Sequence, residues 1–515
     1  MASLNERHEY RDNMMIDWDV PITMDDGLVL RADVFRPMKD GKFPVLLTYG
    51  PYAKNLAFQD GYPSAWQRMA EKHPDVTAGS SNLYQSWEVV DPEKWVPHDY
   101  ACVRVDSRGA GGSPGYIDHW SPRETKDFHD CIEWAGVQPW SNGKVGINGI
   151  SYYAMNAWQV AALQPKHLAA FCAWEGANDW YREVRGHGGI LCTFLQNWYD
   201  MQVKTVQHGL GTRGYRSPMT GDWVCGPQTL PEEQLHANRF DFGRLVLEHE
   251  FDDEFWRSRT PDYSKIKVPL LSNGNWGGQG LHPRGNVEAY LAAGSREKWL
   301  EMHGDAHWTH FYTSYGVSMQ KKFFAYYLKG EKNGWDGQPK VLLQIRHPGE
   351  KFVERAENEW PLARTQWTKL HLDARNYGLS RAPVRKRARS ATRACRKASR
   401  SSCRRSSRRR RSPARSRRSC SSRRRRRTPT SSSSCGRSIR TCRKWSSWAR
   451  STRTRRWRRA GCALRTASST PSVRSPTGPT TRTRRKSRSR RDRCTSSTSR
   501  SGRPASPCRP GTASG

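Results

Sequence analysis

The sequence predicts an α/β fold in which helices cover both faces of a mostly parallel β-sheet. One observation is that short apolar runs typical of buried strands alternate with helical segments along residues 1–380. Another is that this region can build a core, because it holds 19 of the 22 Trp residues and every Tyr and Phe. A chain of 515 residues is long enough for two or three domains.

The first strands follow from period-two alternation and short apolar runs. Residues 20–37 predict two strands with a turn at Asp25–Gly27, because "LVLRADVF" alternates apolar and polar positions. The runs "FPVLLTYG" at 43–50 and "YACVRVD" at 100–106 are typical of buried strands. "SPRETKDFHDCIEWAGV" at 121–137 predicts a helix, since it opens with Ser and Pro and has an acidic first turn.

The alternation continues along the chain. Further strands are predicted at "GKVGINGI", "HLAAFCAWEG", "KVPLLSNGN" and "KWLEMHG", and helices at "SYYAMNAWQVAALQP", "RGNVEAYLAA" and "GVSMQKKFFAYYLKGE". Pro165 ends the first of these helices and Gly330 the last. Residues 180–262 interrupt the pattern and are rich in Trp, Tyr, Arg and Gly. We predict that they form an inserted helical cap.

The basic character of the chain belongs to its last quarter alone. Residues 1–380 carry 41 Lys and Arg against 47 Asp and Glu, whereas residues 381–515 carry 46 against the single acid Asp492. This tail also lacks Phe, Tyr and Met, so it cannot bury enough apolar surface to offset chain entropy, and we predict no compact fold for it. An RNA-binding protein that acts through this Arg/Ser-rich tail is one alternative function.

The cysteines and the apolar runs indicate in which compartment the protein is expected. Five cysteines lie in apolar contexts without CxxC spacing and are predicted to be buried free thiols: Cys102, Cys131, Cys172, Cys192 and Cys225. The first twenty residues carry charges where a signal peptide needs an apolar region, and no run approaches the roughly 18–20 apolar residues of a membrane span. We therefore expect a cytoplasmic protein without a membrane partner.

One serine lies in the context of a nucleophile. In "GINGISYYA" a predicted strand ends near Gly149, Ser151 follows, and a helix starts at once. A sharp strand-to-helix turn of this kind projects a serine hydroxyl at the carboxyl edge of a sheet. The match to G-x-S-x-G is incomplete, because Tyr153 stands where the second glycine should be. The alternative is a serine that merely caps an ordinary helix.

These residues resemble the cocaine-esterase and X-Pro dipeptidyl-peptidase group of α/β-hydrolases (the CocE/NonD hydrolases), which shows G-x-S-Y at this turn. Further segments resemble the group over most of residues 1–380, namely "ITMDDGLVLRADVFRP", "YGPYAKN", "VDSRGAGGSPG" and "FFAYYLKGE". The resemblance implies an α/β-hydrolase fold with a helical cap. It also implies a serine hydrolase that cleaves an ester or amide through an acyl-enzyme and needs no cofactor.

The resemblance assigns roles to three residues around this turn. Ser151 becomes the nucleophile, and the backbone N–H of Tyr152 becomes one donor to the oxyanion. The hydroxyl of Tyr52 becomes the second donor, and a phenol suits that role because its O–H is a strong donor on a stiff ring. Without the resemblance, Tyr52 would be read as a core tyrosine.

A general base is expected in "EMHGDAHWTHFY", which offers three histidines. His307 fits the G-x-x-H pattern beyond the last core strand and is our predicted base, with His310 as the alternative. His303 lies inside the apolar strand and is predicted to be structural. The segment lacks a third ligand for a metal site, and "RGAGGSPG" lacks the spacing of a dinucleotide-binding loop.

The acid of the triad is the weakest part of the match. The group places an Asp two residues after a Trp in the loop following "VPLLSNG", and here Gly278 occupies that position. Glu175 and Asp179 follow the strand after the nucleophile helix and are our predicted substitutes, while a Ser–His dyad is the alternative.

A catalytically impaired binding module on a hydrolase fold also stays open as an alternative function. The expected partner is a small ester or a peptide, with no specific nucleic acid, and a homodimer is compatible with the sequence.

The composition of the tail indicates that it is read in the wrong reading frame. When permitted codons for residues 412–462 and 494–515 are read one nucleotide earlier, both can yield aliphatic residues, carboxylates and alternating strand patterns. These strings resemble the β-jelly-roll domain that follows the hydrolase domain in this family. We therefore predict that residues 381–515 are an out-of-frame reading of such a domain, with a genuine basic tail as the alternative.

Overall fold

The structure is a computed structural model that describes residues 7–278, 281–349, 351–373, 375–376 and 378–384. The predictions for the basic tail fall almost wholly on residues 385–515, which lie outside the described residues.

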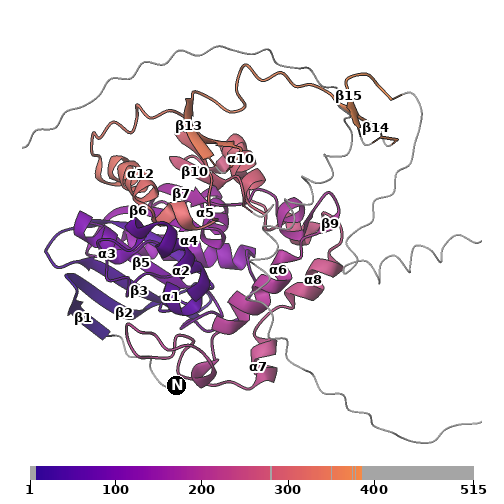
Figure 1. Cartoon of the computed structure of the whole chain (residues 1–515). Helices are drawn as coiled ribbons and strands as arrows, with labels where there is room; N and C mark the ends of the chain where they lie inside the picture. Colours follow the sequence, from indigo (N-terminus) through magenta and orange to yellow (C-terminus); the bar gives the residue numbers. More distant parts are fainter. Residues whose placement is uncertain (1–6, 279–280, 350, 374, 377, 385–515) are drawn as a thin grey trace, which may run out of the picture. The chain divides into compact units, whose positions relative to one another are not determined.

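A single mixed sheet organises the described part of the chain (Figure 1). Strands β4, β5, β6, β7, β10, β11 and β12 run parallel to their neighbours within this set, while β1, β2, β3 and β13 pair antiparallel. The predicted α/β fold with a mostly parallel sheet is confirmed. In order across the sheet the strands are β1 (Arg7–Arg11), β2 (Met14–Thr23), β3 (Val29–Pro37), β5 (Ala101–Asp106), β4 (Phe43–Gly50), β6 (Ser141–Ile150), β7 (Leu168–Trp174), β10 (Leu270–Asn275), β11 (Lys298–His303), β12 (Val341–His347) and β13 (Lys351–Glu357).

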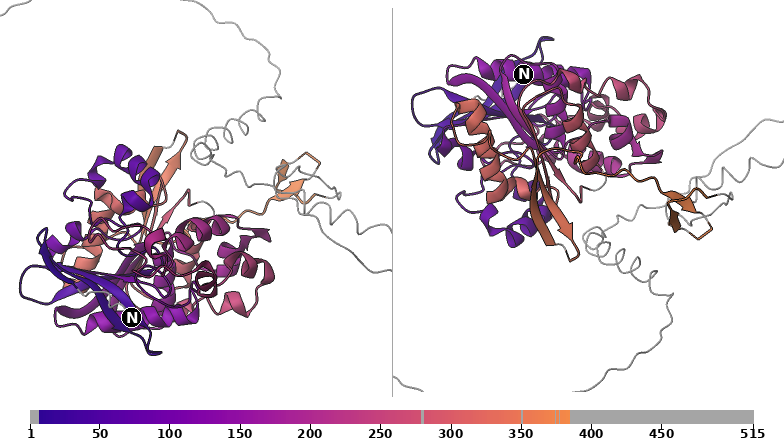
Figure 2. Two further views of the ribbon diagram at one scale, coloured as in Figure 1. Left: turned by 90° about the horizontal axis from the view of Figure 1, so that it is seen from below. Right: turned by 90° about the horizontal axis from the view of Figure 1, so that it is seen from above.

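Helices pack on both faces of this sheet, as Figures 1 and 2 show. Helices α4 (Pro122–Gly136), α5 (Tyr152–Ala162) and α10 (Pro283–Ala292) contribute Phe128, Trp158 and Tyr290 to one apolar cluster. Helix α12 (Ser314–Phe324) contributes Phe323 and Phe324 to a second cluster. Strand β4 supplies alternate residues to the two clusters, which is the pattern of a strand buried on both faces.

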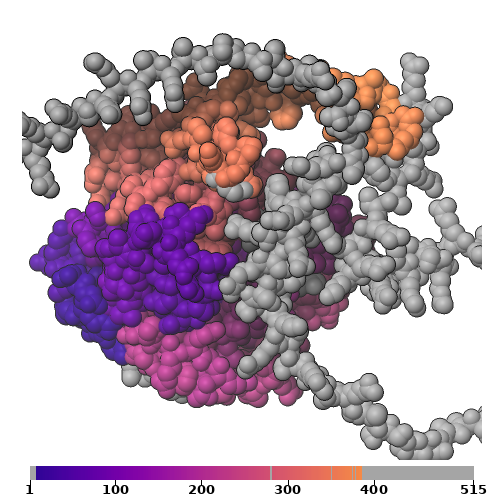
Figure 3. All heavy atoms as spheres, viewed as in Figure 1, coloured from indigo at the N-terminus to yellow at the C-terminus, as the bar shows by residue number. Residues whose placement is uncertain are grey.

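The inserted segment, residues 180–262, is built mainly of short helices. It adjoins the loop after β5 through isolated bridges between Ala110 and Gln207 and between Ile117 and Arg239, and it appears magenta in Figure 3. Its elements are η3 (Trp180–Arg185), β8 (Gly186–His187), β9 (Ile190–Leu191), α6 (Phe194–Trp198), η4 (Tyr199–Val203), η5 (Lys204–Val206), η6 (Gly211–Arg213), α7 (Glu232–Ala237), α8 (Phe242–Glu248) and α9 (Glu254–Arg257).

Shorter elements complete the described residues. They are α1 (Phe58–Gly61), α2 (Pro63–Lys72), η1 (Pro74–Val76), α3 (Pro92–Trp95), η2 (Val96–His98), η7 (Tyr263–Lys265), α11 (Thr309–Tyr312), η8 (Ala325–Lys329), β14 (His371–Asp373) and β15 (Gly378–Ser380). Gly330 ends η8 with a positive φ of 76°. None of the helices among the described residues has the length and apolar character needed to cross a membrane.

The five cysteines of the described region carry free thiols. Four of them are buried, as predicted, whereas Cys192 is half-buried because it follows the exposed β8–β9 hairpin.

The topology brings several loops together at one edge of the sheet. The carboxyl ends of parallel strands lie at the same edge. Tyr52 follows β4, Ser151 follows β6, and Glu175 follows β7. Gly278 and His307 come after β10 and β11. The residues singled out from the sequence therefore lie on loops at this edge.

Candidate active site

Ser151 occupies a strained turn between β6 and α5. Its backbone angles are φ 58° and ψ −111°, a region that costs a non-glycine residue of the order of 1–3 kcal/mol. A Cβ atom on Gly149 would lie 2.5 Å from Cβ of Tyr153 and 3.3 Å from the carbonyl oxygen of Glu88, so the turn needs glycine there. This is the local geometry of a nucleophile elbow.

A histidine that the sequence analysis did not single out lies within hydrogen-bond range of the Ser151 hydroxyl. Nε2 of His282 lies 3.4 Å from Oγ of Ser151, and Nδ1 lies 3.0 Å from the carbonyl oxygen of Gly176. Because a carbonyl only accepts, Nδ1 carries the proton and Nε2 faces the serine as an acceptor. Burial, together with the charge of His307, lowers the pKa of His282 well below its usual value. His282 therefore stays neutral.

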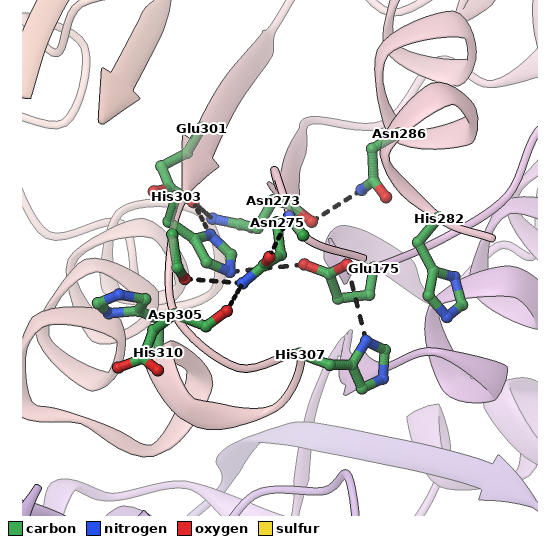
Figure 4. A network of polar contacts seen from close by, with 12 residues as sticks. Glu175, Asn273, Asn275, His282, Asn286, Glu301, His303, Asp305, His307 and His310 are labelled. Atoms are coloured by element: carbon green, nitrogen blue, oxygen red, sulfur yellow. Dashed lines mark hydrogen bonds and ion pairs between the residues drawn. The ribbon is translucent and has the colours of Figure 1, made fainter. Parts of the chain in front are cut away.

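His307 lies between two buried carboxylates, of which Figure 4 shows Glu175. Its Nδ1 is 3.7 Å from Oε2 of Glu175, and its Nε2 is 3.2 Å from Oε1 of Glu88. Burial alone lowers the pKa of His307, but its interactions with the Glu175 and Glu88 carboxylates outweigh burial and raise the pKa to about 9. Burial raises the pKa of Glu88 to about 7, against the opposing effect of His307. The His307 ring stacks on that of His282, with 4.9 Å between centroids.

Glu175 connects this pair to a second histidine. It is fully buried, has a positive φ of 58°, and places Oε1 3.5 Å from Nε2 of His303. His303 in turn lies 2.8 Å from Glu301 through Nδ1, and the charge of Glu301 outweighs burial and raises the pKa of His303. Figure 4 shows Glu175 between His303 and His307. A carboxylate in this position can orient His307 and stabilise its protonated form.

Two other predicted candidates lie elsewhere. The carboxylate of Asp179 accepts from the backbone N–H of Arg182 at 2.8 Å and pairs with its guanidinium at 2.6 Å, which is the role of a helix cap. His310 packs against His303 and Tyr315, and burial with the charge of His303 lowers its pKa to about 4. Neither has a contact with Ser151 or His307 among the described residues.

The predicted oxyanion donors flank the turn. Tyr52 is buried, accepts a hydrogen bond from Nε1 of Trp198 at 2.9 Å, and donates its own proton to none of the described residues. Its ring meets that of Tyr152 edge-on, with 6.0 Å between centroids. The N–H of Tyr152 belongs to the first turn of α5, where amides lack partners within the helix. Both groups are free to donate to a developing negative charge.

A buried lysine fixes the loop that carries Tyr52. Nζ of Lys54 lies 2.6 Å from Asp19 and 2.8 Å from Asp33, and its backbone N–H donates to Asp106 at 2.6 Å. Ala53, between Tyr52 and Lys54, has a positive φ of 63°. The ion-pair network therefore holds a strained loop and sets the position of the Tyr52 hydroxyl.

No part of the described chain gathers three or more His, Cys, Asp or Glu side chains in an arrangement that could hold a metal ion. The histidines of "HGDAHWTH" instead pair with carboxylates or pack against aromatic rings, as described above for His303, His307 and His310.

Comparison with known proteins places this geometry in a family context. Residues 26–312 match the family described as X-Pro dipeptidyl-peptidase (S15 family). Cocaine esterase from Rhodococcus sp. (strain MB1 Bresler) is 27% identical over 397 residues, which cover 70% of this chain and 62% of that protein. Xaa-Pro dipeptidyl-peptidase from Streptococcus pneumoniae (strain Hungary19A-6) is 18% identical over 304 residues, covering 49% and 38%.

A solved structure agrees with the fold. The CocE/NonD family hydrolase from Staphylococcus aureus is 36% identical to this chain and superimposes with a TM-score of 0.60, over 72% of this chain and 60% of that one. The chain thus spans about three fifths of the length of cocaine esterase and of this hydrolase, and less of the dipeptidyl-peptidase.

Proposed function

The chain belongs to the X-Pro dipeptidyl-peptidase (S15) family of α/β-hydrolases, and on that basis we propose that it is a serine hydrolase that cleaves esters or amides through an acyl-enzyme. One observation carries the proposal: Ser151 projects from a strained elbow with an acceptor nitrogen 3.4 Å from its Oγ. A serine hydroxyl is a weak nucleophile at neutral pH and needs a base; the candidates are His282, which faces it, and His307, whose ring stacks on that of His282.

Two imidazoles compete for the role of base, and their surroundings favour His307. A base must carry a positive charge after it takes the serine proton. His307 lies between Glu175 and Glu88, which stabilise that charge. His282 faces only a carbonyl and a second histidine, which do not. We assign His307 as the base and His282 as the residue that holds the Ser151 hydroxyl in the resting site.

The remaining steps follow from this assignment. Oγ of Ser151 bonds to the acyl carbon while its proton moves to neutral His307. The oxyanion that forms accepts hydrogen bonds from the Tyr52 hydroxyl and the Tyr152 amide. His307 then protonates the leaving group, and water, deprotonated by the same histidine, hydrolyses the acyl-serine. Of the two predicted substitutes for the missing acid, Glu175 is the one that orients His307, because Asp179 pairs with Arg182 instead.

Esters are the first substrate class to test. Cocaine esterase matches a larger share of this chain at higher identity than the dipeptidyl-peptidase does. This supports a small ester rather than a peptide as the substrate.

Labelling with a fluorophosphonate probe tests the proposal. The wild-type protein should be modified at Ser151 and should release p-nitrophenol from short acyl esters, and Ser151→Ala should do neither. Ser258→Ala, at an exposed serine in the inserted segment, serves as the control and should behave as wild type. Labelling at another serine, or wild-type turnover by Ser151→Ala, would overturn the assignment.

A further inference from the structure

A cavity of about 300 Å³ lies where the inserted segment meets the start of α10. The β8–β9 hairpin forms one wall, with Gly188 and Gly189 both in positive-φ conformations at its turn. The lining contains three arginines and no carboxylate. Its residues are Tyr181, Arg182, Arg185, Gly186, His187, Gly188, Gly189 and Arg284.

Two of the arginines are neutralised by carboxylates outside the lining. Arg182 pairs with Asp179 at 2.6 Å and with Asp252 at 3.3 Å. Arg284 pairs with Glu183, a buried carboxylate that also accepts from backbone N–H groups of the loop after β7. These two side chains therefore bring no net charge to the cavity.

Arg185 is different, because no carboxylate pairs with it among the described residues. The residue is 8% exposed, and its Nε is buried without a hydrogen bond. The Tyr181 ring lies 5.8 Å from its guanidinium carbon, which is a cation–π contact and not an ion pair. A buried cation without an anion is costly. A fold retains such a group most readily where a ligand supplies the missing negative charge.

The cavity lies close to the candidate active site along the chain. Arg284 is two residues after His282, whose Nε2 faces Ser151 Oγ at 3.4 Å. Consecutive Cα atoms are about 3.8 Å apart, so the two Cα atoms are separated by at most about 7.6 Å. The cavity and the candidate active site therefore meet at the same end of α10, where His282 faces Ser151 and Arg284 lines the cavity.

We propose that this cavity binds a carboxylate of the substrate, so that the enzyme prefers monoesters or monoamides of dicarboxylic acids. The inference rests on the proposed function, because it concerns the substrate of Ser151. One unpaired guanidinium supplies one positive charge, which matches a carboxylate monoanion better than a phosphate dianion. The planar guanidinium also suits two parallel hydrogen bonds to carboxylate oxygens.

A matched pair of esters tests the preference. The p-nitrophenyl monoester of glutaric acid carries a carboxylate, whereas p-nitrophenyl hexanoate has a neutral chain of similar length. We expect wild type to have the higher kcat/KM for the glutarate ester. Arg185→Met should lose about 10- to 100-fold on the glutarate ester and little on the hexanoate, as expected for a charge-assisted hydrogen bond. Arg244→Gln is the control, because Arg244 is an exposed arginine of the same inserted segment that pairs with Glu248 and does not line the cavity.

A binding measurement separates this inference from the proposed function. In the Ser151→Ala background the glutarate ester cannot turn over, and its binding should raise the Tm. Arg185→Met should abolish that rise without lowering the Tm of the free protein, because it removes an uncompensated buried charge. A lower Tm for the free variant would mark Arg185 as structural and overturn the proposal.

The other outcomes are equally distinct. Equal kcat/KM for the two esters in the wild-type enzyme would overturn the carboxylate preference and leave the hydrolase intact. No turnover of either ester and no labelling of Ser151 would instead overturn the proposed function. A Tm rise with inorganic phosphate as large as that with the glutarate ester would show a general anion site and contradict recognition of a substrate carboxylate.

Discussion

Oε2 of Glu175 lies 3.0 Å from the point where a Cβ atom on Gly278 would stand. The family pattern places the acid of the triad at position 278, on the loop after β10. Here a carboxylate reaches the same space from the end of β7, one strand away in the sheet. Gly278 leaves room for it, and the site keeps an acid beside His307 although the expected aspartate is absent.

Replacing this acid should slow the reaction severely. Glu175→Gln removes the charge that stabilises protonated His307, and by analogy with other triads kcat should fall by about 10³- to 10⁴-fold. Asp179→Asn is the control and should stay near wild type, because Asp179 pairs with Arg182 instead. Steady-state kinetics with a p-nitrophenyl ester measure both. Wild-type rates in both variants would instead favour a Ser–His dyad.

Introducing an aspartate at position 278 should raise kcat only in a variant whose residue 175 is neutral. A Cβ on Gly278 would meet Cδ of Pro283 at 2.8 Å, so Gly278→Asp requires a local shift. In wild type it also brings two carboxylates together, and we expect lower kcat. In the Glu175→Gln background the same change should recover part of the lost activity. A double variant no better than Glu175→Gln would argue against a shared acid position.

The two imidazoles should differ in their contribution to rate. His307→Gln removes the proposed base, and kcat should fall by about 10⁴-fold or more. His282→Gln retains an acceptor for the Ser151 hydroxyl and should cost much less. His310→Gln, remote from the serine, is the control. If His282→Gln proves the most damaging variant, the role of base passes to His282.

The rate should depend on pH through His307. A base acts only when it is unprotonated, so kcat/KM should rise as the pH rises through the His307 pKa of about 9. Glu88→Gln removes one of the two carboxylates that raise this pKa, and the midpoint should move down by about 1 to 3 pH units. A pH–rate profile of both proteins is the measurement. An unchanged midpoint would place the titration on another group.

Removing the charge of Lys54 should destabilise the protein. Lys54→Met leaves Asp33 buried beside Asp19 without a cation, and breaking such a pair costs about 3–5 kcal/mol of unfolding free energy. Lys72→Met breaks an exposed pair with Asp305 and should cost at most about 1 kcal/mol. Urea unfolding measures both. Similar losses in the two variants would show that the buried network adds no particular stability.

The C-terminal tail is open to a direct test at the level of DNA. If residues 381–515 are read out of frame, sequencing across codons 370–390 should show a one-nucleotide deletion relative to a frame that continues with aliphatic and acidic residues. An intact frame, with Arg/Ser-rich tail peptides found in the expressed protein by mass spectrometry, would show that the basic tail is genuine.

Much of the fold could be predicted because it rests on local patterns. The runs that form β4 and β6 are short, apolar and bounded by glycine, and α4 has a Ser–Pro start, so each was placed within a few residues. No element was assigned to β1 or β13. Strand β13 is largely exposed and β1 has no aliphatic residue, so pairing with a neighbouring strand, rather than local sequence, defines them.

Only part of the site could be predicted from the sequence, because only part of it rests on local patterns. The elbow at Ser151 and the G-x-x-H pattern at His307 are local signals, and both assignments stay predictions. His282 faces Ser151 across 131 residues of sequence, and Glu88 meets His307 across 219. The only local sign of His282 is its position just before the Pro that starts a helix. Contacts of this range are made by the topology of the sheet.

Three side chains at the site project from backbones in the left-handed region: Ser151 and Glu175 at φ 58°, and Glu88 at φ 63°. Glycine at any of the three would relieve the strain and also remove a reacting or charged group. Thermal resistance and chemistry thus make opposite demands at the same positions.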